Sequence, residues 1–165
     1  MKKLFLIRHA KSSWKDNGLS DFDRPLNKRG KRDAPFMGKI LKEEGIKPDL
    51  IVTSPAKRAC TTARMIARKL DYPKERINSD ETIYEASPGE LIKLINNIPI
   101  EYKVVMLVGH NPGLTQLSNL LTGKYLENIP TTGIVEINFD ANFWKGISIN
   151  TGKLKSFEYP KKYLA

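Results

Sequence analysis

The chain has 165 residues, 40% apolar and 28% charged, which fits one globular domain over residues 1–165 with a sizeable core. Its formal net charge of +10, from 28 Lys and Arg against 18 Asp and Glu, favours anionic partners. No stretch approaches the ~18 consecutive apolar residues of a membrane helix, and the start MKKLFLIRHA lacks the roughly 7–15 apolar residues of a secretory signal, so we expect a cytoplasmic protein.

The first strand and the first helix follow from an apolar run and two helix-end signals. Leu4–Arg8 is a short apolar run, typical of a buried strand. Asn27 is placed to cap a helix that Gly45 ends. Pro35 falls inside this helix, so we expect a bend or a restart of the helix near Asp33.

A second strand is predicted at Leu50–Thr53. Ser54-Pro55 follows it, a capping residue with proline at the first helical position. Small and apolar side chains then recur at helical spacing, which predicts a helix whose stripe faces the core. This stripe consists of Ala56, Ala59, Cys60, Ala63, Ala67 and Leu70.

The second half of the chain repeats this pattern. Ser87-Pro88-Gly89-Glu90 matches a capping box and predicts the start of a third helix. Val104–Val108 is a continuous apolar run, typical of a strand that is buried on both faces. Asn111-Pro112 then opens a fourth helix that runs through Leu121. Two further strands are predicted in the tail, at Ile134–Phe139 and Leu154–Tyr159.

Strands that alternate with helices predict an α/β fold: a three-layer sandwich whose mostly parallel sheet has helices on both faces. In such sheets ligands bind beyond the carboxyl ends of the strands. The first strand ends in Arg8-His9, the second in Ser54 before a helix that carries Arg58, and the third before His110. If these strands are parallel neighbours, the two histidines of the chain and two arginines converge at one edge of the sheet.

This convergence of charge fits a phosphoryl group, because arginine forks and helix N-termini both bind phosphate oxygens. A metal site is disfavoured, since the residues near the histidines are arginines and no H-E-x-x-H spacing occurs. A triad is also disfavoured, because no G-x-S-x-G elbow is present and Cys60, the only cysteine, lies in the apolar stripe. Neutral imidazole is itself a nucleophile towards phosphorus, so we expect chemistry without a metal or a cofactor.

The motifs at these strand ends resemble a known family. Arg8-His9-Ala10 resembles the RHG or RHA signature of the histidine phosphatase superfamily, whose fold is phosphoglycerate mutase-like. The strings RHAKSSW, DFDRPLNKRG, TSPAKRACTTA and VGHNPGL together resemble the small phosphohistidine phosphatase branch, in order and in spacing, from Leu4 to about Leu121. The resemblance implies a metal-independent phosphatase.

The resemblance also implies roles for individual residues. His9 would be the nucleophile and would carry the phosphoryl group as phosphohistidine. Arg8, Arg58 and His110 would form the phosphate pocket, with Arg24 of the DRPL string near it.

A general acid is implied on the segment TIYEA, where Glu85 is the best match and Glu81 is the competitor. Some members of the superfamily have a phosphate-contacting Asn a few residues after the signature. This chain has Lys15 near that place, which puts the contact in doubt. The polar loop Asp16–Asp23, which contains Gly18, is a candidate mobile flap.

The substrate is the least determined feature. Phosphoglycerate mutases carry long insertions that enclose a sugar phosphate and support oligomers. This chain has no room for such insertions. We therefore expect an open pocket, and a monomeric protein is compatible with the sequence. Protein phosphohistidine is the first hypothesis and small phosphoesters are the alternative. A non-catalytic anion or nucleic-acid binder is a distant third, because the basic residues are spread out and no aromatic residues interleave with them.

Overall fold

The computed structural model describes residues 1–16 and 18–164, so position 17 of the predicted Asp16–Asp23 flap lies outside the described residues. Within these residues, six strands form one sheet: β1 (Lys2–Arg8), β2 (Leu50–Thr53), β3 (Asn78–Ser79), β4 (Val104–Gly109), β5 (Ile134–Phe139) and β6 (Gly152–Glu158). Their order is β3-β2-β4-β1-β5-β6. The first four strands of this order run parallel, while β5 and β6 pair antiparallel at one edge.

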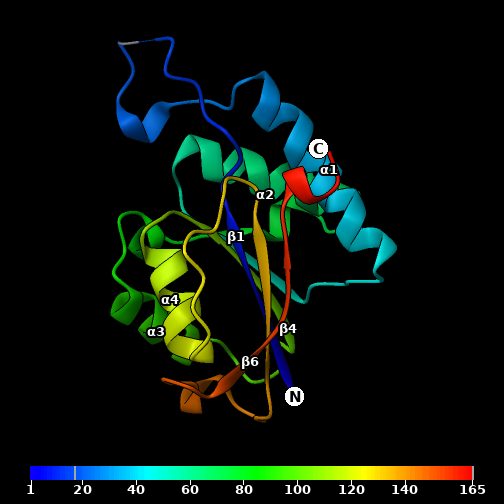
Figure 1. Ribbon diagram of the computed structural model, residues 1–165, viewed down its shortest axis with the longest axis vertical. Coiled ribbons are helices and arrows are strands. Elements are labelled where there is room, and N and C mark those ends of the chain that lie inside the picture. The colour runs from blue at the N-terminus through cyan, green and yellow to red at the C-terminus, as the bar shows by residue number, and fades with distance from the viewer. Residues whose placement is uncertain (17, 165) are drawn as a thin grey trace.

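Helices cover both faces of the sheet, as predicted (Figure 1). They are α1 (Lys28–Glu43), α2 (Lys57–Lys69), α3 (Pro88–Asn96) and α4 (Gly113–Thr122). Side chains of β1 alternate between two cores: Leu4 and Leu6 pack with α3 and α4, whereas Phe5 and Ile7 pack with α1 and α2. Among the described helices, none is both long and apolar enough to cross a membrane.

Two helix starts are confirmed at the level of single hydrogen bonds. The Asn27 side chain accepts a hydrogen bond from the Gly30 amide at the start of α1. Ser87 and Glu90 form a complete capping box at the start of α3. In both cases the capping residue satisfies a backbone N–H that has no partner inside the helix.

The expected restart of helix α1 near Asp33 is wrong, while the expected bend stays a prediction. The helix runs without a break through Pro35. Proline removes one intrahelical hydrogen bond, but buried side chains on both sides of it anchor the same helix to the core. These side chains are Ala34, Met37 and Leu41.

The expected cap at Ser54-Pro55 is also wrong. The helix α2 begins at Lys57, and its N-cap residue, Ala56, has no side-chain cap. The hydroxyl of Ser54 accepts from the amide of Ala56 at 3.2 Å, ahead of the helix, and also lies 2.7 Å from the imidazole of His110. The short strand β3 was not predicted, because its two residues are exposed and carry no apolar signal.

The segment that follows His9 is held against the first turn of α1. The Asn27 amide donates to the carbonyl oxygen of Lys11 at 3.0 Å. Gly30 packs so closely on the same carbonyl that a Cβ atom there would lie 2.2 Å from the oxygen. The glycine is therefore required by a close approach of two backbones beside the nucleophile that the sequence predicts.

We predict that Gly30→Ala lowers the free energy of unfolding by roughly 1–3 kcal/mol, because a backbone carbonyl must move to admit the methyl group. The measurement is urea denaturation. Gly89→Ala is the matched control in α3, since its Cβ would meet nothing closer than 3.9 Å. Equal unfolding midpoints for the two variants would contradict the prediction.

Candidate active site

The carboxyl ends of β1, β2 and β4 lie side by side. In the sheet Arg8 pairs with Gly109 and Thr53 pairs with Val108. The amide of His9 donates to the carbonyl of Gly109 at 3.0 Å, and the ring centroids of His9 and His110 are 5.1 Å apart. The parallel register thus brings the two histidines together at one edge of the sheet.

His9 is buried and is held in one tautomer. Its Nδ1 lies 2.8 Å from the carbonyl oxygen of Ala10, which can only accept, so Nδ1 carries the proton. The Nε2 lone pair then faces Arg58, whose Nε lies 3.4 Å away. Burial lowers the pKa of His9 to about 3, and the positive charges around it act in the same direction. His9 is therefore a neutral imidazole at neutral pH, with Nε2 available as a nucleophile.

His110 is oriented by two neighbours. Its Nδ1 lies 3.4 Å from Nη2 of Arg58, which can only donate, so Nδ1 accepts. The proton of His110 is then on Nε2, which donates to the hydroxyl of Ser54 at 2.7 Å. Burial, followed by the charge of Arg58, lowers the pKa of His110 to about 4. Ser54 is a site residue that the sequence analysis assigned to a helix cap.

Arg58 is the centre of the site. It is buried, and its three nitrogens contact both histidines and Asp21. Arg8 donates from Nη1 to the carbonyl of Ile129 at 3.0 Å, while its buried Nε has no hydrogen-bond partner among the described residues. Burial, together with the charge of Arg58, lowers the pKa of Arg8. The buried guanidinium of Arg58 and the half-buried guanidinium of Arg8 together form a binding site for an anion.

Arg24 is also buried near this pocket, where the sequence resemblance placed it. Its Nε and Nη2 both donate to Oδ1 of Asp21, at 3.2 and 2.9 Å. Nη1 donates to the hydroxyl of Ser12, and the guanidinium lies 3.5 Å from the ring centroid of the exposed Trp14. Arg24 therefore contacts the site through Asp21 rather than through a histidine.

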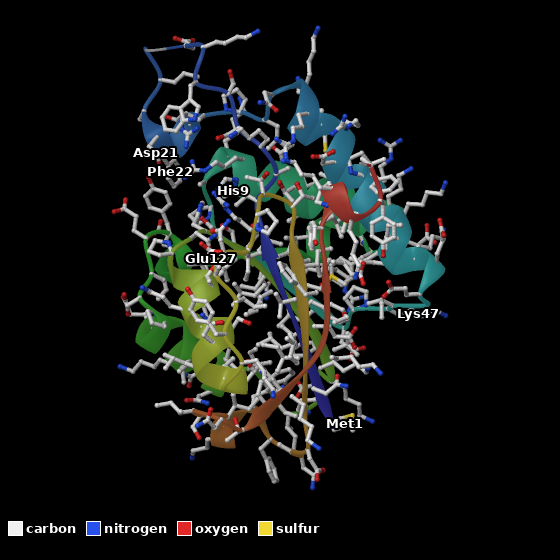
Figure 2. All side chains as sticks on the ribbon, viewed as in Figure 1. Met1, His9, Asp21, Phe22, Lys47 and Glu127 are labelled. Carbon is white, nitrogen blue, oxygen red and sulfur yellow. The ribbon has the colours of Figure 1, made fainter. Side chains whose placement is uncertain are left out.

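Asp21 and Tyr84 are site residues that the sequence analysis missed. The Tyr84 hydroxyl donates to Oδ2 of Asp21 at 2.7 Å, and the ring of Tyr84 packs edge-on against His110. Figure 2 shows Asp21 and Phe22 on the segment beside His9. Partial burial alone would raise the pKa of Asp21, but the hydrogen bonds of Tyr84 and Arg24 and the charge of Arg58 hold it well below its usual range. The hydrogen bond to Asp21 in turn raises the pKa of Tyr84 to about 12.

The candidate general acids remain predictions, because neither Glu85 nor Glu81 makes a hydrogen bond or an ion pair with the described site residues. Glu85 is exposed, makes no hydrogen bond or ion pair to the described site residues, and has a φ of 58°, in the left-handed region. Glu81 is exposed at the start of a short 3-10 turn, and Lys15 is exposed as well. It is Tyr84, the neighbour of Glu85, that reaches the pocket. Within residues 1–16 and 18–164, no group of three or more His, Cys, Asp or Glu side chains could hold a metal ion.

The buried histidines predict a specific dependence on pH. Both imidazoles stay neutral in the folded protein down to about pH 5, whereas the unfolded chain takes up protons near pH ~6.5. The neutral rings therefore make their full contribution to the free energy of unfolding above pH ~6.5. This contribution falls as the pH drops towards about 4, by on the order of 1 kcal/mol per pH unit for each histidine. The measurement is a pH titration of the two histidine rings by proton NMR. A titration midpoint near pH ~6.5 for either ring of the folded protein would contradict the prediction.

Comparisons with known proteins agree with this geometry. The model of the histidine phosphatase superfamily (branch 1) matches residues 4–106. An uncharacterized protein of Mycobacterium tuberculosis is 30% identical over 165 residues, which cover 94% of this chain and 100% of that protein.

Among solved structures, a candidate phosphohistidine phosphatase SixA from Agrobacterium tumefaciens is 28% identical, with a TM-score of 0.81 over 96% of this chain and 98% of that chain. The protein histidine phosphatase SixA complexed with tungstate has a TM-score of 0.84 at 20% identity, over 97% and 98% of the two chains. These similarities confirm the predicted phosphoglycerate mutase-like fold. The chain belongs to the histidine phosphatase superfamily.

Proposed function

We propose that this protein is a phosphatase that hydrolyses a phosphoryl group through a covalent phosphohistidine intermediate on His9, and that its substrate is protein phosphohistidine. The observation that carries the proposal is the unprotonated Nε2 of His9, which lies in a buried pocket with Arg8, Arg58 and His110. A neutral imidazole beside two guanidinium groups combines a nucleophile with stabilisation of phosphate charge.

In the first step Nε2 of His9 attacks phosphorus, and a P–N bond forms as the bond to the leaving group breaks. Arg58 and Arg8 stabilise the charge on the phosphoryl oxygens. His110 donates from Nε2 to Ser54 and orients Arg58 through its Nδ1. Donors that are preorganised around developing charge are each worth about 3–4 kcal/mol. The carbonyl of Ala10 holds the Nδ1 proton, so the imidazole does not need to rotate or change tautomer before it attacks.

In the second step a water molecule attacks the phosphorus of the phosphoenzyme. A P–O bond forms, the P–N bond to His9 breaks, and inorganic phosphate leaves. One proton of the water stays on the phosphate. The other passes to the solvent and replaces the proton that the leaving imidazole takes up from the solvent in the first step. Nε2 of His9 then regains its lone pair, and the site returns to its starting state.

Within the described part of the chain, Asp21 is the one carboxylate that is hydrogen-bonded to the site, which supports phosphohistidine over an alkyl phosphoester. An alkoxide is a poor leaving group and requires a proton, whereas imidazole leaves more readily. Among the described residues, the carboxylate that touches the pocket is Asp21, and its lowered pKa prevents it from donating a proton near neutral pH. The fold similarity to SixA proteins, one of them complexed with tungstate, agrees with a phosphoryl substrate.

We predict that wild-type protein gains one phosphoryl group when it is incubated with a phosphohistidine protein, and that His9→Ala gains none. Intact-protein mass spectrometry after an alkaline quench measures the adduct, and release of phosphate from the donor measures turnover. His110→Ala is the control for the second histidine and is expected to keep the adduct with slower formation. Full activity of His9→Ala would refute the nucleophile assignment.

We predict that Glu85→Gln and Glu81→Gln both leave the hydrolysis of phosphohistidine unchanged, because imidazole needs a proton less than an alkoxide does and neither carboxylate makes a hydrogen bond or ion pair with the described site residues. The same pair tests the alternative substrate class. A small alkyl phosphoester as substrate, with its rate reduced roughly 10²-fold or more by one of the two substitutions, would identify that glutamate as a general acid and favour small phosphoesters.

A further inference from the structure

Asp21 occupies the part of Arg58 that a phosphoryl group would bind. The two outer nitrogens of a guanidinium form the fork that recognises phosphate and carboxylate oxygens. In this structure Nη2 of Arg58 donates to Oδ2 of Asp21 at 3.0 Å, and Nη1 donates to the main-chain oxygen of Asp21 at 2.7 Å. One residue therefore takes both arms of the fork.

The carboxylate of Asp21 is itself saturated. Oδ1 accepts two hydrogen bonds from Arg24, and Oδ2 accepts from Tyr84 as well as from Arg58. A carboxylate oxygen accepts about two hydrogen bonds, so Asp21 has no capacity left for a further donor. A bound phosphoryl group would bring its own negative charges next to this carboxylate, and like charges at such distances repel.

The turn that carries Asp21 has the exposure of a movable element. The side chain of Asp21 keeps 48% of its surface accessible although two arginines and a tyrosine hold it. The following residue, Phe22, is also exposed and contacts Tyr84 edge-on. The turn Asp21–Asp23 contains no buried residue, so the apolar contact that opposes its displacement is the exposed one of Phe22 with Tyr84.

We propose that Asp21 is an internal counter-anion that occupies the Arg58 fork in the resting protein, and that a phosphoryl group binds by displacing it. The inference rests on the proposed function, since it assumes that Arg58 binds the phosphoryl group beside His9. It makes Asp21 a specificity-determining residue. A ligand must outcompete a fully paired carboxylate, which a phosphoryl dianion does better than a singly charged anion. Arg24 and Tyr84 hold the carboxylate in the competing position.

The opposite role is a permanent partner that positions Arg58 for phosphate. The two roles differ in the sign of one measurement. If Asp21 competes with phosphate, removal of its charge strengthens phosphate binding. If Asp21 positions the guanidinium, removal of the carboxylate charge lets the Arg58 side chain adopt other conformations and weakens phosphate binding.

The experiment is isothermal titration calorimetry of inorganic phosphate into wild type, Asp21→Asn and Asp23→Asn at constant ionic strength. Asp23→Asn removes an equal charge from the same turn, where the carboxylate accepts from Ser20 and contacts no arginine. We expect Asp21→Asn to bind phosphate roughly tenfold more tightly than wild type, which corresponds to the loss of one competing ion pair. Asp23→Asn should stay within twofold of wild type.

Two further comparisons make the result decisive. Tyr84→Phe removes one hydrogen bond to Asp21 and should tighten phosphate binding in the same direction by a smaller factor. Urea denaturation confirms that each variant is folded. Unchanged or weaker phosphate binding by Asp21→Asn overturns the inference, and so does an equal gain in Asp23→Asn, which would show only a general effect of charge.

The outcome is separable from that of the proposed function. Hydrolysis of a phosphohistidine protein by wild type, without tighter phosphate binding by Asp21→Asn, refutes the counter-anion alone. Tighter binding by Asp21→Asn in a protein that hydrolyses no phosphorylated donor upholds the counter-anion at an anion site and refutes the phosphatase proposal. Absence of measurable phosphate binding in all four proteins overturns the inference.

Discussion

The parallel pairing of β1 with β4 is the constraint on which the site depends. It sets Arg8 opposite Gly109, so that His9 and His110 leave the sheet side by side. The apolar side chains of β1 alternate between two cores, one against α3 and α4 and the other against α1 and α2. A slip by one residue would turn every one of them to the wrong face. Hydrophobic packing on both faces of the sheet therefore maintains the register that brings the histidines together.

This register concentrates groups that would repel one another if all were charged. Arg8 and Arg58 stay positive, but burial keeps the rings of His9 and His110 neutral at neutral pH. Asp21 supplies one negative charge to Arg58, and the buried Nε of Arg8 has no partner among the described residues. The pocket thus keeps a positive charge that its own residues balance only in part. A phosphoryl dianion supplies the charge that is needed, which is why the geometry favours phosphoryl chemistry over binding of a cation.

The sequence was sufficient to predict where β1, β2 and β4 end, because each is a short apolar run that stops before a polar site residue. It was not sufficient for the contacts made by loops. Asp21 and Tyr84 are 63 positions apart, and they meet only because two polar segments fold over the same edge of the sheet. Ser54 carried a local helix-cap signal, but its hydroxyl bonds the amide of Ala56 ahead of the helix and also contacts His110, which no local signal indicates. Pro35 was expected to interrupt a helix that core packing keeps continuous. Local sequence signals therefore predicted the helices and strands, whereas the contacts that complete the site are made by loops and were not predicted.

Asp21 affects both the charge of the pocket and the access of a ligand to the pocket. Its carboxylate holds the hydroxyl of Tyr84, and the ring of Tyr84 lies between the rings of Phe22 and His110, edge-on to both. When Asp21 leaves Arg58, Tyr84 loses the acceptor of its hydroxyl, and the contact with Phe22 loses its support. The displacement that frees the arginine fork therefore also loosens the aromatic residues beside the pocket. A single carboxylate that ties the turn to the arginine thus couples the two changes.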